Sequence, residues 1–189
     1  RTAGRLCVGF SGGADSHSLL HALVELSHRE ALPPIIALHV NHGLHEDASA
    51  WAAHCASVAS DLGVEFHERV VHVDAGSSPE AQARDARYTV FESFLADRDV
   101  LLLGHHLDDQ VETVLFRLIR GAGPSGLAGI PEQRPLGRGL LMRPLLGITR
   151  DQIEDYAGSH ELSYLNDGSN DDTRYDRNFL RHEVLPLIE

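Results

Sequence analysis

The sequence predicts an α/β protein with a doubly wound, mainly parallel sheet of five strands and helices on both faces of the sheet. Strand-like apolar runs alternate with segments of helical periodicity, which is typical of βαβ units. The runs at 35–38 and 100–103 are continuously apolar, as expected of strands that are covered on both faces. A glycine-rich turn follows the first run and leads directly into a helical pattern.

The expected elements follow in order along the chain. Apolar runs bounded by turn residues predict strands over Arg5–Phe10, Ile35–Asn41, Phe66–Val73 and Val100–Gly104, and a short fifth strand in LLMRPLL (140–146). Apolar residues at helical spacing predict helices over Asp15–Ser27, Ala48–Leu62, Pro79–Ala96 and Leu107–Arg120, one capped by Thr149, and a last one near Asn178–Glu189. The Gly/Pro-rich segment 121–139 predicts a long surface loop, and NDGSNDD (166–172) predicts a turn.

The composition excludes several classes of protein. No apolar run approaches the ~20 residues of a membrane-spanning helix. Cys7 and Cys55 form no CxxC pair, which argues against a zinc or iron–sulfur site and fits a reducing cytoplasm. All 16 basic residues are arginines and the net charge is −12, a poor overall footprint for a nucleic-acid binder. Between 117 and 150, however, six arginines stand against a single acid, Glu132.

The turn SGGADS (11–16) predicts an anion site, above all for phosphate. At the carboxyl end of a parallel strand, a glycine turn and the helix after it present backbone N–H groups and a positive dipole. Ser11 and Ser16 can add hydroxyl donors. Asp15 has two interpretations: it caps the helix, or it reaches a Mg²⁺ that the phosphates also bind. The lysine-bearing nucleotide P-loop is excluded because the chain has no lysine.

A second group of polar residues lies in GHHLDDQVETVLFRLIRGAG (104–123), where a strand leads into a helix. His105, Asp109 and Glu112 stand at i, i+4 and i+7, on one face of the helix or its approach. Taken alone, these residues have a purely structural interpretation: the acids interact favourably with the positive end of the helix dipole, and the histidine caps the helix. If the first and fourth strands are neighbours, however, the carboxylates lie beside the anion site and have a role in holding Mg²⁺.

The S-G-G-x-D-S loop resembles the PP-loop of the N-type ATP pyrophosphatases, which split ATP between the α and β phosphates. Further segments resemble, in order, those of the tRNA(Ile)-lysidine synthase family: LHVNHGL, EAQARDARY, GHHLDDQVET, RLIRGAGPSGLAGI, RPLLGITRDQI and DGSNDDTRYDRNFLRHEVLPLI. The resemblance covers nearly the whole chain. It implies a PP-loop ATP-binding catalytic domain in residues 1–145 and a C-terminal helical part of the same domain in 146–189, which leads to further domains.

The resemblance implies an ATP-dependent tRNA modification. Enzymes of this family adenylate C2 of the wobble cytidine of an isoleucine tRNA with a CAU anticodon, and free L-lysine then displaces AMP to give lysidine. The implied co-substrate and metal are ATP and Mg²⁺. A cytoplasmic location, no contact with a membrane and a homodimer are implied as well.

The resemblance also assigns roles to residues. The loop residues Ser11, Gly12, Gly13, Ala14, Asp15 and Ser16 bind ATP, whose pyrophosphate is the leaving group, and His39 and Asn41 belong to the nucleoside pocket. His105, Asp109 and Glu112 form the catalytic face together with Asp15, which with Asp109 is a candidate Mg²⁺ ligand. Either Asp109 or Glu112 faces the incoming amine.

Several arginines also match the family. Arg177 and Arg181 match its R-N-x-[IL]-R motif and would clamp a phosphate. The alternative is a solvent-exposed helix face on which they interact with Asp176 and Glu183. A further set is implied in contacts with tRNA or the rim of the site: Arg84, Arg87, Tyr88, Arg117 and Arg120. One departure concerns residues 167–170, which read D-G-S-N where the family often has D-P-S-N, so this turn loses the rigidity of proline.

The sequence has three alternative functional interpretations. A tRNA 2-thiocytidine synthetase of the same superfamily would need paired cysteines for sulfur chemistry. An amide-forming ligase of the same fold, such as an NAD or GMP synthetase, would lack the RNA-related segments after Arg120. A non-catalytic nucleotide-binding module would need the glycine loop but not His105, Asp109 and Glu112 beside it.

Overall fold

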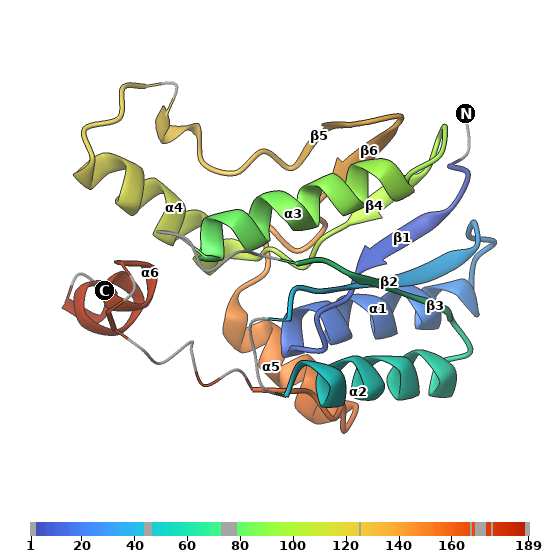
Figure 1. Cartoon of the computed structure of the whole chain (residues 1–189). Helices are drawn as coiled ribbons and strands as arrows, with labels where there is room; N and C mark the ends of the chain where they lie inside the picture. The colour runs from blue at the N-terminus through green and yellow to red at the C-terminus, as the bar shows by residue number, and fades with distance from the viewer. Residues whose placement is uncertain are drawn as a thin grey trace.

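The computed structural model describes residues 3–43, 47–72, 79–124, 126–166, 168, 173–174 and 176–187, and it has the predicted α/β architecture (Figure 1). The strands are β1 (Leu6–Gly9), β2 (Ile35–Asn41), β3 (Glu65–Val70), β4 (Val100–Leu102), β5 (Gln133–Leu136) and β6 (Gly139–Met142). The α-helices are α1 (Ala14–Ser27), α2 (Ala48–Asp61), α3 (Pro79–Phe94), α4 (Leu107–Ile119), α5 (Arg150–Ser159) and α6 (Asp176–Phe179). Among the described helices, none has the length and apolar character needed to cross a membrane.

The strands form one sheet in the order β3-β2-β1-β4-β6-β5. All pairings are parallel except β5 with β6. The chain builds outward from β1 to β3 and then returns to place β4 on the other side of β1, so that α1 and α2 cover one face of the sheet and α3 covers the other (Figure 1). The predicted neighbourhood of the first and fourth strands is therefore confirmed, and their carboxyl ends meet at the point where a doubly wound sheet binds its ligands.

Apolar side chains fill the space on both faces of the sheet. One core cluster joins Cys7, Ile36 and Leu101 to Phe91 of α3, and the other joins Val8, Ala37 and Leu102 to side chains of α1 and α2. Successive residues of a strand point to opposite faces. A strand buried on both faces must therefore be apolar at every position, which is why the continuous apolar runs marked the central strands correctly.

The sheet has six strands rather than the predicted five. The additional strand, β5, lies in the segment 121–139 that was predicted to be a loop throughout, and it pairs with β6 in an antiparallel hairpin. Pro135 lies within β5, opposite Leu140. Proline removes an N–H donor and is tolerated only where no neighbouring strand needs it, and β5 forms the edge of the sheet. The Gly/Pro content that suggested a loop reflects this edge position and the Gly137 turn, where φ is +54°.

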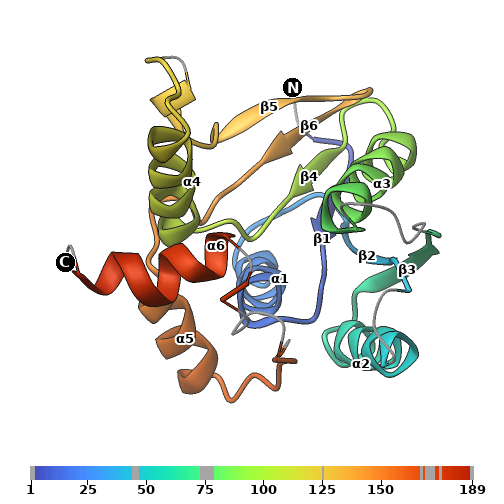
Figure 2. The same cartoon turned by 60° about the vertical axis from the view of Figure 1, so that its left-hand side comes forward.

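The C-terminal elements pack against the helices that flank the site. Thr149 caps α5 as predicted, because its hydroxyl accepts a hydrogen bond from the N–H of Gln152. Helix α5 contacts α1, and α6 contacts α4 (Figure 2). The last helix was predicted as one element, but α6 gives way to a wide π-type turn over Leu180–Val184 and a 3₁₀ turn over Leu185–Leu187. Pro186 lacks the N–H that a continuing α-helix requires. The predicted turn at 166–172 lies largely outside the described residues.

Candidate active site

The glycine turn connects β1 to α1 and depends on glycine for its shape. Gly12 has φ of +86°, and a Cβ there would lie 2.9 Å from Sγ of Cys55 and 3.3 Å from Leu165. Its carbonyl accepts a hydrogen bond from the N–H of Leu165 at 2.9 Å. Gly13 is the extended residue just before α1. The first N–H groups of a helix have no partner within the helix, so the turn presents them at the carboxyl end of β1.

The two serines of the turn brace it. The hydroxyl of Ser16 donates to the carbonyl of Gly13 at 3.1 Å and accepts from the backbone N–H of Ser11 at 3.2 Å. The two hydroxyls are 3.0 Å apart. Since the Ser16 proton is directed to Gly13, the Ser11 hydroxyl is the donor between them. These hydrogen bonds therefore fix the conformation of the loop. A bound anion would accept hydrogen bonds from the same hydroxyl groups.

The end of β4 comes into direct contact with the start of α1. A Cβ on Gly104 would lie 3.1 Å from the carbonyl carbon and oxygen of Asp15 and 3.2 Å from the nitrogen of Ser16. These are backbone atoms, and 3.1 Å is tighter than ordinary van der Waals contact. Glycine at this position lets the β4–α4 connection lie directly against the loop, which brings the two predicted groups of functional residues together.

Asp15 and Asp109 converge on one buried histidine, His106. The Nε2 atom of His106 lies 3.8 Å from Oδ2 of Asp15 and 3.7 Å from Oδ2 of Asp109. The same Asp109 oxygen accepts the backbone N–H of His106 at 3.1 Å. Burial raises the pKa of Asp15; His106 works against this rise and Asp109 adds to it. Two carboxylates thus face one region from two strand ends, a suitable arrangement for a cation shared with phosphate oxygens.

His105 is held as a neutral hydrogen-bond donor. Burial lowers the pKa of its imidazole to about 4, with Asp109 working against the shift and Arg143 adding to it. The guanidinium Nε of Arg143 donates to Nδ1 of His105 at 3.2 Å. A neutral imidazole carries one N–H, so the proton of His105 resides on Nε2, where it can be donated to a ligand.

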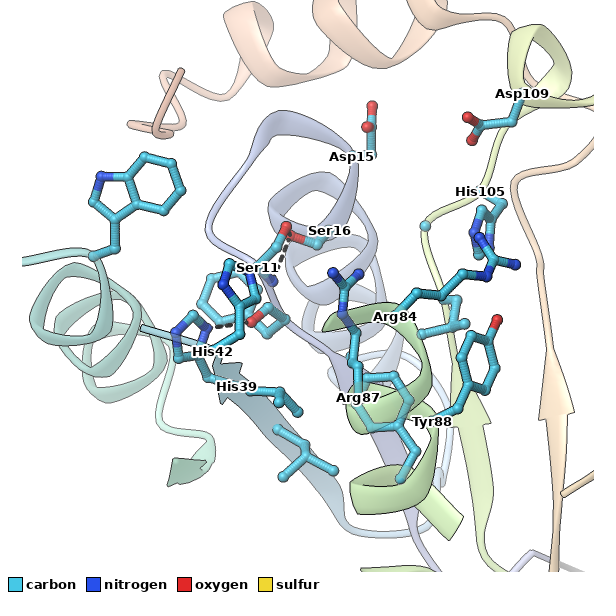
Figure 3. A pocket seen from close by; sticks show the side chains of 18 residues that line it. Ser11, Asp15, Ser16, His39, His42, Arg84, Arg87, Tyr88, His105 and Asp109 are labelled. Atoms are coloured by element: carbon cyan, nitrogen blue, oxygen red, sulfur yellow. Dashed lines mark hydrogen bonds between the residues drawn. The ribbon is translucent and has the colours of Figure 1, made fainter. Parts of the chain in front are cut away.

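These residues surround a cavity of about 350 Å³ (Figure 3). Six of the predicted site residues line it: Ser11, Asp15, Ser16, His39, His105 and Asp109. Arg84 and Arg87 project into it from α3, on the side opposite the loop (Figure 3). Partial desolvation of its guanidinium and the charge of Arg84 lower the pKa of Arg87, although the residue as a whole is exposed. Guanidinium groups, helix N–H groups and carboxylates therefore face one space, as a metal–triphosphate ligand requires.

The other end of the cavity is formed by β2. The Nδ1 atom of His39 lies 2.8 Å from the carbonyl oxygen of Phe10. A carbonyl only accepts, so Nδ1 carries the proton and Nε2 is an acceptor; burial lowers the pKa of this imidazole and keeps it neutral. Asn41, predicted beside it, does not line the cavity: its side chain donates to Glu68 and accepts the N–H of Gly43.

Three of the predicted residues do not line this cavity. Glu112 is fully buried, and its Oε1 accepts Nε of Arg181 at 2.6 Å. Arg181 is therefore engaged by Glu112 rather than by a neighbour on its own helix. Arg177 donates to the hydroxyl of Thr113 at 3.2 Å. Together these contacts fasten the C-terminal helix to α4.

The sequence reasoning missed several residues that the structure places at the site. His106 was passed over in favour of its neighbour, although its position before an acid at the third helical residue is typical of a helix start. Arg143 was not singled out, although it is the one charged residue within the apolar run LLMRPLL. His42 and Trp51 also line the cavity. Nothing in the sequence marked these two as its neighbours.

The chain is similar to known tRNA-modifying enzymes. It is 53% identical to the tRNA(Ile)-lysidine synthase of Pseudomonas aeruginosa and 55% identical to that of Pseudomonas syringae pv. tomato, over 188 residues in each case. The enzyme of that name from Legionella pneumophila is 47% identical over 188 residues. These alignments cover 97–100% of this chain and 42% of each relative. The chain therefore spans less than half the length of the curated relatives it matches.

The fold is also similar to a solved structure. The U34-tRNA thiolase NcsA from Methanococcus maripaludis, solved with its 4Fe-4S cluster, superposes with a TM-score of 0.68 and 22% sequence identity. The match covers 88% of this chain and 60% of NcsA, and at this identity it concerns the fold alone. The family described as the PP-loop domain matches residues 1–188. Because this match extends over all but the last residue, the chain belongs to the PP-loop family.

Proposed function

We propose that the chain is the catalytic part of a tRNA(Ile)-lysidine synthase. In the proposed reaction, ATP adenylates C2 of the wobble cytidine through its oxygen, releasing pyrophosphate, and free L-lysine then displaces AMP. The observation that carries the proposal is the convergence of Asp15, from the glycine loop, and Asp109, from the β4–α4 junction, on one side of a shared cavity. The similarity to lysidine synthases over the whole chain supports the choice of reaction.

In the first step, the cytidine oxygen attacks the α-phosphorus and negative charge accumulates on the departing pyrophosphate. With ATP in this cavity, the N–H groups at the start of α1 and the guanidinium of Arg87, which lines the cavity, would face this charge. Donors fixed in place before the reaction stabilise a leaving group with little reorganisation. His105, neutral and protonated on Nε2, adds an uncharged donor to the same cavity.

In the second step, an amine of lysine attacks C2, AMP leaves with the electrons of the broken C–O bond, and the amine passes a proton to a carboxylate that faces it. Two acids were candidates to face this amine. Glu112 is fully buried, paired with Arg181 and absent from the cavity wall, whereas Asp109 lines the cavity. We therefore assign the contact with the amine to Asp109 and a structural role to Glu112.

The carboxylates fit a Mg²⁺ ion that ATP shares. Among the described residues, no group of three or more histidine, cysteine or acidic side chains forms a ready metal cage. Mg²⁺ bound with nucleotides characteristically uses one or two carboxylates and completes its shell with phosphates and water. Asp15 and Asp109 would hold it, and it would neutralise charge on the phosphates.

The cysteines argue against sulfur transfer. Cys7 and Cys55 are the only cysteines, both are buried, and they belong to the core clusters on opposite faces of the sheet. Burial raises the pKa of Cys7 to about 11 and that of Cys55 to about 12, so neither is a thiolate near neutral pH. A thiolase built on this chain would lack both a reactive thiolate and a pair of ligands.

The test is pyrophosphate release from ATP in the presence of lysine and tRNA with a CAU anticodon. We expect release to require both lysine and tRNA. Asp109→Asn keeps an oxygen for the N–H of His106 but removes the charge, and we expect it to lower the rate at least ~100-fold. Asp151→Asn, a change at an exposed acid in the first turn of α5, is the matched control and should retain the wild-type rate.

Release that does not depend on lysine would contradict the proposal, and so would an Asp109→Asn variant that works as well as Asp151→Asn. Release without tRNA would favour a small-molecule ligase. The homodimer and the cytoplasmic location stay predictions that rest on the resemblance alone.

A further inference from the structure

A second cavity, of about 420 Å³, adjoins the first and is rich in arginine. The two share Arg84, Tyr88 and His105 in their walls. Five guanidinium groups line the second cavity: Arg84, Arg117, Arg134, Arg143 and Arg177. They come from α3, α4, β5, the end of β6 and α6, so residues far apart in the chain converge here. Of the described residues that line it, Asp85 is the one acid.

Among the described residues, the partners of Arg143, the most buried of these cations, are all neutral. It is 3% exposed. Its guanidinium donates to Nδ1 of His105, to the carbonyl of Pro131 at 2.6 Å and to the hydroxyl of Tyr88 at 3.4 Å. Burying a charge without a counter-charge is costly. Burial lowers the pKa of Arg143; Tyr88 works against this shift, whereas the nearby Arg134 and Arg84 add to it. An anion in the cavity would remove this cost.

The other four guanidinium groups also contact neutral groups. Arg117 donates to the carbonyls of Gly126 and Gly129, and Arg177 donates to Thr113. Arg134 and Arg84 lie over the ring of Tyr88, 5.2 and 5.5 Å from its centre. The arginines with an ion pair in the described part of the chain include Arg5, Arg138, Arg150 and Arg181. None of the five cavity arginines is among them.

We propose that this second cavity binds a phosphodiester of the RNA strand, next to the nucleotide whose base enters the first cavity. The inference rests on the proposed function, because it assumes an RNA substrate. Guanidinium groups bind phosphate oxygens bidentately and keep their charge when buried. Free lysine is a poorer fit, since its net charge near neutral pH is positive and five cations would repel it. The shared wall places such a phosphate one side chain away from the ATP cavity.

The experiment measures binding of an anticodon stem-loop RNA with a wobble cytidine, by fluorescence anisotropy over a range of KCl concentrations. Arg134→Ala is the test variant, and Arg134→Lys keeps the charge without the bidentate geometry. Arg138→Ala is the matched control, because Arg138 lies on the same hairpin but pairs with Asp97 at 2.6 Å, outside the cavity. We expect Arg134→Ala to weaken RNA binding about tenfold and to reduce the slope of log K against log[KCl] by about one.

A second arm locates the phosphate. For wild type, an RNA with a neutral methylphosphonate beside the wobble cytidine should bind about tenfold more weakly than unmodified RNA. For Arg134→Ala, the two RNAs should bind equally well. Binding of an ATP analogue should be the same in all variants, whose folding is checked by circular dichroism. A changed affinity for the ATP analogue would mean that the cavity takes free polyphosphate, and a changed KM for lysine with unchanged RNA binding would mean that it takes the amino acid. Either result overturns the inference.

The two proposals fail in different ways. If wild type releases pyrophosphate with lysine and tRNA, but Arg134→Ala binds RNA with the same affinity and salt slope as Arg138→Ala, the phosphodiester site is wrong and the proposed function stands. If wild type neither binds the RNA nor needs it for pyrophosphate release, both are wrong.

Discussion

Replacing Gly104 with alanine would push apart the two segments on which the site depends. The added Cβ would lie 3.1 Å from the carbonyl carbon and oxygen of Asp15 and 3.2 Å from the nitrogen of Ser16. All three are backbone atoms, so no side chain can rotate away and the β4–α4 connection or the start of α1 has to move. Overpacking of this kind costs about 1–3 kcal/mol of unfolding free energy. For a chain of this size, each kcal/mol lowers Tm by about 2–4 °C.

The measurement is thermal unfolding followed by circular dichroism, together with calorimetric binding of a non-hydrolysable ATP analogue. We expect Gly104→Ala to lower Tm by roughly 5 °C and to weaken binding of the analogue, because the displaced atoms belong to the loop that holds it. Gly158→Ala is the matched control: apart from neighbouring atoms of its own helix, no heavy atom lies within 4 Å of a Cβ there, and Gly158 lies within α5. This variant should gain about 0.5–1 kcal/mol of stability from helix propensity. If Gly104→Ala matched it in Tm and bound the analogue as wild type does, the close approach of the two segments would be refuted.

Three further changes test other contacts. Arg181→Met leaves the carboxylate of Glu112 buried without its partner and should cost about 3–5 kcal/mol in urea unfolding; a loss below about 1 kcal/mol would show that the pair is dispensable. Cys7 and Cys55, whose raised pKa values keep them protonated at pH 8, should react with a thiol reagent only after unfolding, and a rapid reaction of the native protein would contradict their burial. Gly12→Ala combines a positive φ with a contact of 2.9 Å to Cys55 and should lower both Tm and affinity for the ATP analogue, whereas unchanged values would show that the turn adapts.

The sequence predicted correctly those elements whose local residue pattern favours the same structure as their packing in the folded chain. The central strands are buried on both faces, so their apolar runs are uninterrupted and identify them without further information. The turn SGGADS combines glycines that permit an unusual backbone with residues that start a helix, and both features are local. Thr149 and Gln152 form a capping box within four residues. In each case a few neighbouring residues carry all the information needed.

The remainder depended on contacts between distant residues. The pairing of β5 with β6 depends on an edge position that no local sequence pattern predicts. The proline at 135 favoured a loop rather than a strand. The resemblance placed Glu112 on the catalytic face with Asp109, from which it is separated by a helical spacing. Its hydrogen-bond partner in the structure is Arg181, 69 residues further along. Similarly, Arg143 binds His105 across 38 residues. Helical spacing shows which residues share a face, but not what packs against that face.

The overall charge of −12 and an arginine-lined cavity are compatible because they act over different ranges. Charges at the surface are screened over about 8–10 Å at physiological salt, so acids that lie further than this from the cavity contribute little to the potential inside it. Within a recess, low-dielectric walls strengthen the field of the groups that line it. Five guanidinium groups with neutral partners and one exposed acid therefore make a basic site in an acidic protein. Whether such a chain can bind a polyanion depends on which arginines lack a carboxylate partner. Composition alone does not report this, and it follows only from the ion pairs of the folded chain.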